Sequence, residues 1–98
     1  MDIRIKSLRF EHSEKLEEFI QKKVSKLDKY FDEIIYVDVT LKVIKPETVS
    51  NKQVEIMVSV PSNELFAEKV SDSFEESVDM VVEAVKKQLT KHKEKIKR

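Results

Sequence analysis

The sequence predicts an α+β domain with the element order β-α-β-β-β-α, in which two helices pack on one face of a four-stranded sheet. Apolar residues alternate with polar ones in four short segments, which is the period of a half-buried strand. They recur every three or four residues in two longer segments, which is the period of an amphipathic helix. With 98 residues and no repeat or linker, the chain is expected to form one domain over residues 1–98.

The first half of the chain predicts one strand and one helix. Residues 2–8 place Ile3 and Ile5 on one face of a strand, with charged residues between them. Ser13 is a suitable N-cap, because its hydroxyl can accept a bond from a free first-turn amide. The helix is expected to run to about Phe31. Its apolar stripe consists of Leu16, Ile20, Val24, Leu27 and Phe31.

The second half predicts three strands and a helix. Strands are expected at residues 34–44 and 52–60, joined by a polar loop at 45–51. A tight connection at 61–64 leads to a short strand with Leu65 and Ala67 inward, and Asn63 is the expected residue of positive φ in a chain without glycine. The last helix starts near residue 72 and reaches residue 91 or beyond, before a flexible basic tail at 93–98. Its apolar seam consists of Phe74, Val78, Val81, Val85 and Leu89.

Composition excludes several classes of site. The chain has no cysteine and therefore no disulfide or thiolate zinc site, and it has no glycine for a phosphate-binding loop. It contains no apolar run long enough to span a membrane, which favours a cytoplasmic protein. His12 and His92 have no metal ligands at suitable spacing, and nothing in the sequence brings Ser, His and Asp together. We therefore expect that the protein is not an enzyme and that it binds no cofactor and no metal.

The distribution of charge is more informative than its total, because 19 basic and 19 acidic residues cancel. On a helical wheel, Lys15, Lys22, Lys26 and Lys29 share one lateral sector of the first helix, and Lys23 lies nearer the apolar stripe. The last helix is acidic at its start and basic from Lys86 onward. Side by side, the two basic edges would line a groove suited to a phosphate backbone. Dipole complementation and a solvated lysine face are the alternative explanations.

Several segments carry a family resemblance over nearly the whole chain. They are the opening Ile3-Arg4-Ile5, the capped Ser13-Glu14-Lys15-Leu16, the lysine-rich segment 23–29, the hairpin 60–67, Val78-Asp79, and the closing segment 88–93. In this order and spacing, the sequence resembles the hibernation-promoting factor and ribosome-associated inhibitor family, also called sigma modulation proteins. The resemblance implies a fold like that of double-stranded RNA-binding domains.

The resemblance also implies a function. Members of this family bind the small ribosomal subunit between head and body, where mRNA and the A- and P-site tRNAs would bind. They block translation and stabilise idle ribosomes in stationary phase or stress. Basic residues of both helices make the contact with ribosomal RNA. The matching positions in this chain are Lys22, Lys23, Lys26, Lys29, Lys86, Lys87 and Lys91.

Chain length and the basic end resemble the short promoting-factor type. That type implies a protein that is monomeric off the ribosome and a separate small modulation factor for ribosome pairing. Two alternatives remain open. One is a generic double-stranded RNA binder, which would recognise A-form shape. The other is a protein-interaction module that uses the acidic half of the last helix. Salt dependence separates binding to phosphates from binding to an apolar protein surface.

Overall fold

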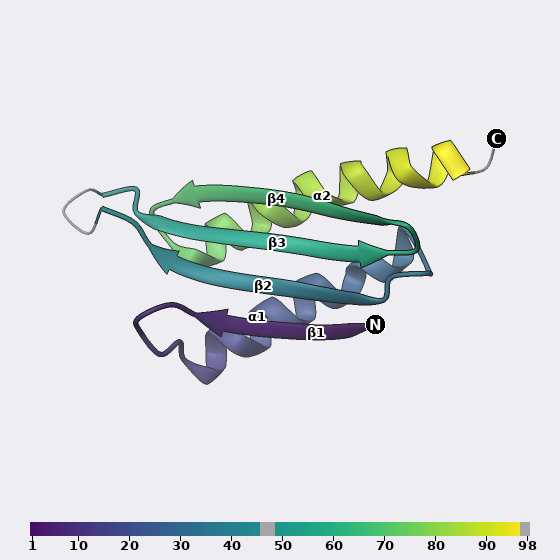
Figure 1. Cartoon of the computed structure of the whole chain (residues 1–98). Helices are drawn as coiled ribbons and strands as arrows, with labels where there is room; N and C mark the ends of the chain where they lie inside the picture. Colours follow the sequence, from purple (N-terminus) through teal and green to yellow (C-terminus); the bar gives the residue numbers. More distant parts are fainter. Residues whose placement is uncertain (46–48, 97–98) are drawn as a thin grey trace.

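A computed structural model describes residues 1–45 and 49–96. The four strands form one sheet in the order β1-β2-β3-β4, and both helices lie on the same face of it (Figure 1). This arrangement confirms the predicted fold class. The elements are β1 (Asp2–Ser7), α1 (Glu14–Ser25), a 3₁₀ helix η1 (Lys26–Lys29), β2 (Tyr36–Val43), β3 (Lys52–Val60), β4 (Asn63–Ser71) and α2 (Phe74–Ile96).

The sheet is mixed, and its register explains the alternation in the sequence. β1 is parallel to β2 because α1 carries the chain back across the sheet, whereas the other two pairs are antiparallel. The register aligns Ile5, Val39, Ile56 and Ala67 in one row across all four strands. The apolar set therefore faces the helices, and the residues between face the opposite side.

The core lies between the sheet and the two helical stripes. Every residue of the predicted first stripe is buried, from Leu16 to Phe31. In α2, the residues Val78, Val81, Val85 and Leu89 are fully buried. Phe74 is partly buried and stacks on Phe10, with ring centroids 5.3 Å apart. The predicted helix faces are therefore confirmed.

The first helix ends earlier than the sequence predicts. The α-helix stops at Ser25, and residues 26–29 form a 3₁₀ turn, although Phe31 is still buried. The Ser25 hydroxyl donates to the backbone oxygen of Lys22 over 3.0 Å, a local bond that competes with continued helix. In the tighter 3₁₀ geometry residues three apart eclipse each other, which keeps Lys29 on the same side as Lys26.

The β3–β4 hairpin corrects two further predictions. The residue with positive φ is Ser62 at 65°, and the prediction of Asn63 was wrong. Val60 pairs with Asn63, so Pro61 and Ser62 alone form the turn, and a proline followed by positive φ is the pattern of a type II turn. The Asn63 side chain instead accepts a bond from the Glu64 amide over 2.9 Å. β4 then continues for nine residues, longer than the short strand expected.

The remaining boundaries differ by a few residues. β2 is shorter at both ends than the expected strand at 34–44. The predicted loop covers residues 45–51, and its residues 46–48 lie outside the described residues. α2 begins at Phe74, because the Ser73 hydroxyl caps it by accepting the Glu76 amide over 3.1 Å. Residues 93–96 of the expected tail continue α2 as helix, and residues 97–98 lie outside the described residues.

A buried hydroxyl joins α2 to the sheet and gives a first prediction. Ser77 is fully buried; its hydroxyl donates to the backbone oxygen of Lys52 over 2.6 Å and lies 2.7 Å from the Ser71 hydroxyl. We expect Ser77→Ala to lower the free energy of unfolding by about 1–3 kcal/mol, because both partners lose a bond in a dry site. Urea denaturation measures this. Ser59→Ala, at a half-exposed position, should change stability by less than about 0.5 kcal/mol.

Candidate nucleic-acid interface

The groove between the two helices contains only part of the predicted basic edges: Lys26 lines it, whereas Lys87, Lys91 and Lys95 do not. α1 and α2 lie next to each other behind the sheet (Figure 1). The groove between them has a volume of about 270 Å³. Its lining comes from three elements: Lys23 of α1, Lys26 of η1 and Tyr30 just after η1, and Asp79, Val82, Glu83 and Lys86 of α2. We call these residues the interhelical groove.

Acidic residues of α2 hold two of the lysines in the groove. Lys23 Nζ lies 3.1 Å from Asp79 Oδ1, and it also lies 5.4 Å from the centre of the Phe19 ring. Lys86 Nζ lies 3.7 Å from Glu83 Oε1 and 4.9 Å from the centre of the Tyr30 ring. These side chains are about one third to two thirds exposed, so each ion pair stabilises the fold by at most about 1 kcal/mol. The carboxylates therefore hold the two lysines only weakly.

The other predicted RNA-binding lysines lie around the groove. Lys26 is exposed and, within residues 1–45 and 49–96, forms no ion pair. Lys87 and Lys91 line a neighbouring hollow on α2 together with Lys86, Thr90 and Glu94. Lys22 and Lys29 are exposed on α1 and η1 but line neither hollow. The structure thus brings Lys23, Lys26 and Lys86 together, and places Lys87 and Lys91 next to them.

Tyr30 and Thr90 belong to this surface, although the sequence did not single them out. Tyr30 directly follows the lysine-rich segment, and the tighter turn of η1 places its ring beside Lys86 of the other helix. The only sequence signal was the position of an aromatic residue one place before the buried Phe31. Its partner on α2 depends on tertiary packing, which no local pattern encodes.

Tyr30 also raises the pKa of Lys86, which gives a second prediction. A hydrogen bond with Tyr30 and, second, the Glu83 carboxylate raise the pKa of Lys86. A raised pKa means that the folded state holds the lysine proton more tightly than the unfolded state does. The resulting contribution to the free energy of unfolding is complete below the ordinary lysine pKa and is lost as the pH rises through the pKa of the folded state. We expect Tyr30→Phe to lower the pKa of Lys86, measured by NMR of its side chain.

Glu83→Gln is the matched variant for that measurement, and it should lower the pKa of Lys86 by less. A pKa that does not change in Tyr30→Phe would show that the tyrosine hydroxyl does not contact this lysine. Because the expected pKa change lies in the alkaline range, both variants should bind RNA at neutral pH with the lysine fully charged.

Basic side chains continue around the end of α2, toward the β3–β4 hairpin. Lys91 and Lys95 line a hollow with Gln88, His92, Asn63 and Leu65. The Gln88 amide donates to the backbone oxygen of Phe66 over 2.8 Å, and the His92 ring meets the edge of Phe31 with centroids 5.1 Å apart. This end of α2 is therefore anchored to the sheet while its lysines face outward.

The structure brings a serine, a histidine and a glutamate together, a contact that the sequence did not indicate. The His12 ring contacts the Ser7 hydroxyl through Nδ1, and its Nε2 lies 2.6 Å from Glu17 Oε1. Ser7 ends β1, and Glu17 lies in the first turns of α1, so this chain of contacts ties the strand to the helix it precedes. The two histidines themselves remain far apart in the sequence.

The described residues also lack two other features. Within the described ranges, His, Asp and Glu do not form a group of three or more that is able to hold a metal ion. None of the helices in that part of the chain combines the length and the apolar character needed to cross a membrane.

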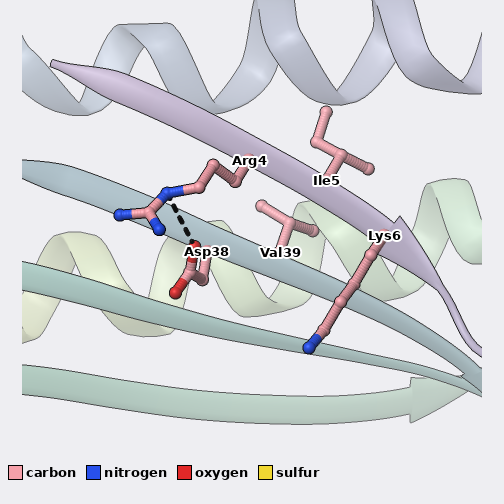
Figure 2. Close-up of a pocket in the computed structure, with 5 residues that line it drawn as sticks. All are labelled: Arg4, Ile5, Lys6, Asp38 and Val39. Atoms are coloured by element: carbon pink, nitrogen blue, oxygen red, sulfur yellow. Dashed lines mark ion pairs between the residues drawn. The ribbon is translucent and has the colours of Figure 1, made fainter.

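The sheet face opposite the helices, which we call the open face, carries a different set of charges. Arg4 and Lys6 project over the sheet from β1, as Figure 2 shows, and they line a hollow of about 230 Å³. Arg4 Nε lies 3.3 Å from Asp38 Oδ1, and its guanidinium stacks 4.2 Å from the centre of the Tyr36 ring. Arginine, aromatic ring and carboxylate therefore form one compact unit on this face.

Comparison with known proteins places the chain in a family. The family model described as "Sigma 54 modulation protein / S30EA ribosomal protein" matches residues 3–97. The chain is 34% identical over 97 residues to the ribosome hibernation promoting factor of Escherichia coli strain K12, a match that covers 99% of this chain and 98% of that protein. It is 27% identical to the factor of the same name from Pseudomonas putida, covering 97% and 89%.

Solved structures agree with this match. A ribosomal subunit interface protein from Coxiella burnetii is similar with a TM-score of 0.85 and 26% identity, covering 95% of this chain and 98% of that one. The N-terminal domain of Protein Y from Thermus thermophilus, 20% identical, has the same fold with a TM-score of 0.81 and covers 94% and 99%. Since the family model spans almost the whole chain and the similarity to the Escherichia coli factor is full-length, the chain belongs to the Sigma 54 modulation protein / S30EA ribosomal protein family, together with the ribosome hibernation promoting factors.

Proposed function

We propose that this chain is a ribosome hibernation factor that binds the small ribosomal subunit in the channel for mRNA and the A- and P-site tRNAs. It blocks translation by occupying that channel and does no chemistry. The observation that carries the proposal is the interhelical groove, in which lysines of both helices converge, in a chain related over its full length to ribosome hibernation promoting factors. Its role in stress or stationary phase follows from the same proposal.

The proposed mechanism is electrostatic and steric. Lys22, Lys23, Lys26 and Lys29 on one side, with Lys86, Lys87 and Lys91 on the other, pair with phosphates of the small-subunit RNA and release counterions. Lys23 and Lys86 exchange Asp79 and Glu83 for phosphate oxygens, and the carboxylates return to them on release. The two lysines thus have an anionic partner in both states, whereas Asp79 and Glu83 lose theirs on binding, which limits the affinity and favours reversible binding.

The partners follow from this mechanism. The protein contacts small-subunit rRNA and the ribosomal proteins beside it, in the cytoplasm, and it needs no cofactor. We propose that it is a monomer off the ribosome and that ribosome pairing, where it occurs, depends on a separate modulation factor.

Competition with tRNA tests the proposed place of binding. Labelled protein is bound to purified small subunits, and P-site tRNA with a short mRNA is titrated in. We expect tRNA to displace the protein in proportion to its occupancy of the P site, and the protein to inhibit cell-free translation over the same concentration range. Simultaneous binding of both ligands at saturation would contradict the channel as the site.

The same competition format tests the first alternative, and the structure bears on the second. A generic double-stranded RNA binder would be displaced equally well by an unrelated RNA duplex, because it recognises only A-form shape. A module that uses the acidic half of α2 is disfavoured by the ion pairs of Asp79 and Glu83, which direct these carboxylates into the groove toward lysines of the same chain.

A further inference from the structure

The open face carries a second patch of side chains over β3 and β4, separate from the interhelical groove. No helix crosses it (Figure 1). Phe66 points onto it, because its neighbours Leu65 and Ala67 are buried on the other side, and its side chain is 52% exposed. Its cross-strand partner is Met57, which is partly buried. The exposed ring and Met57 beside it give this half of the face a small apolar surface.

Carboxylates flank this ring on the same strand. Glu64 and Glu68 lie two residues before and after Phe66, about 7 Å away along β4 on the same face. Both are exposed, and Glu68 accepts one bond, from Gln53 over 2.8 Å. Glu55 of β3 also faces this side, but it is paired with Lys42 of β2, whose Nζ lies 2.8 Å from Glu55 Oε2. We call Met57, Glu64, Phe66 and Glu68 the Phe66 patch.

The other half of the same face shows what such a patch binds. There, an aromatic ring and a carboxylate on neighbouring positions of β2 hold a guanidinium: Arg4 stacks on Tyr36 at 4.2 Å and pairs with Asp38 at 3.3 Å. The Phe66 patch has the ring and the carboxylates, but within the described part of the chain no cation lies over the ring. An arginine from another molecule would complete the same arrangement of guanidinium, aromatic ring and carboxylate.

RNA is a poor candidate for this surface, because its phosphates would meet Glu64 and Glu68 and the patch, unlike the interhelical groove, contains no lysine to offset them. Proteins that are themselves bound to RNA have the opposite character, since they carry exposed arginine and lysine. They are also the proteins that lie next to a chain held on rRNA by its lysine groove. Charge complementarity thus points to one class of partner.

We infer that the Phe66 patch docks an arginine-containing segment of a basic, RNA-bound protein, with the guanidinium stacked on Phe66 and paired with Glu64 or Glu68. This inference rests on the proposed function, since the ribosome supplies such proteins. The helices then hold rRNA while the opposite face of the sheet holds protein. The patch adds affinity only where RNA and protein are present together.

Binding to intact small subunits and to protein-free small-subunit rRNA tests the inference. We expect Phe66→Ala and Phe66→Leu to weaken binding to intact subunits by roughly tenfold, because both remove the ring, and to leave binding to protein-free rRNA unchanged. Thermal melts check folding. The Leu variant keeps apolar bulk, so equal losses in the two variants would identify stacking and not simple packing as the cause.

Charge reversal sharpens the test. Glu64→Lys with Glu68→Lys should weaken binding to intact subunits but strengthen binding to protein-free rRNA. The matched control, Glu33→Lys with Glu75→Lys, makes the same change in net charge at two exposed positions away from the patch and should strengthen both. Unchanged binding of the Phe66 variants to intact subunits, or an equal loss on protein-free rRNA, would overturn the inference.

Failure of the proposed function looks different in the same assay. If the wild-type chain binds neither intact subunits nor their rRNA, the proposed function is wrong and the inference falls with it. If the wild-type chain binds both and the Phe66 variants match it, only the inference fails.

Discussion

Lys26→Glu combined with Lys87→Glu is expected to abolish ribosome association while leaving the fold intact. Lys26 lines the interhelical groove from the η1 side, and Lys87 lines the neighbouring hollow on α2, so the pair removes one contact from each side of the proposed RNA site. Each reversal also places a carboxylate where a phosphate should bind. We expect affinity for small subunits to fall by about a hundredfold or more, measured by equilibrium binding.

Both lysines are exposed, so the melting temperature should change little. Lys6→Glu with Lys69→Glu is the matched control: it has the same net charge, but the changes lie on β1 and β4, outside the groove. If the double variant in the groove still binds as tightly as this control, the lysine surface is not the RNA site.

The largest loss of stability is expected from Leu27→Ala. Leu27 is fully buried and is the only buried residue of η1, the segment that carries Lys26 and Lys29. Deleting a core leucine costs about 2–5 kcal/mol, because the neighbours do not close the cavity completely. For a domain of this size, that lowers the melting temperature by at least about 10 °C. Calorimetry measures both quantities.

Ile35→Ala provides the comparison, because this side chain is 55% exposed and should change the melting temperature by only a few degrees. Below its melting temperature, Leu27→Ala should also bind RNA more weakly, since η1 loses the contact that fixes it against the core. If the Leu27→Ala variant is as stable as the Ile35→Ala variant, η1 is not anchored through Leu27.

The fold was predictable because hydrophobic period is a local signal that survives into the packed structure. The stripe from Leu16 to Phe31 and the α2 seam are buried as expected. The errors lie where one side chain decides the backbone. Ser25 bonds back to Lys22 at the end of α1, Ser73 caps α2, and Ser62 takes the positive φ in place of Asn63. Which of several similar polar residues caps a helix or takes a positive φ depends on the turn that the neighbouring elements impose.

The candidate site was predictable only in part. The lateral lysine sector follows from helix geometry, and its proposed RNA role rests on the family resemblance. The sequence did not reveal that Tyr30 lies beside Lys86, that Asp79 pairs with Lys23, or that Ser7, His12 and Glu17 form one chain of contacts. Each of these joins separate elements, so it exists only after the helices have packed. Phe66 likewise becomes meaningful only beside Arg4 and Tyr36 on the same open face.

Cosedimentation of the purified protein with ribosomal subunits through a sucrose gradient, at low and at moderate salt, tests the central claim most directly. We expect the protein to travel with the small subunit at low salt and to leave it as salt rises, because contacts with several phosphates weaken on the order of a thousandfold over that range. A protein that stays at the top of the gradient at every salt concentration, or that remains bound regardless of salt, would contradict a lysine groove that holds the small-subunit RNA.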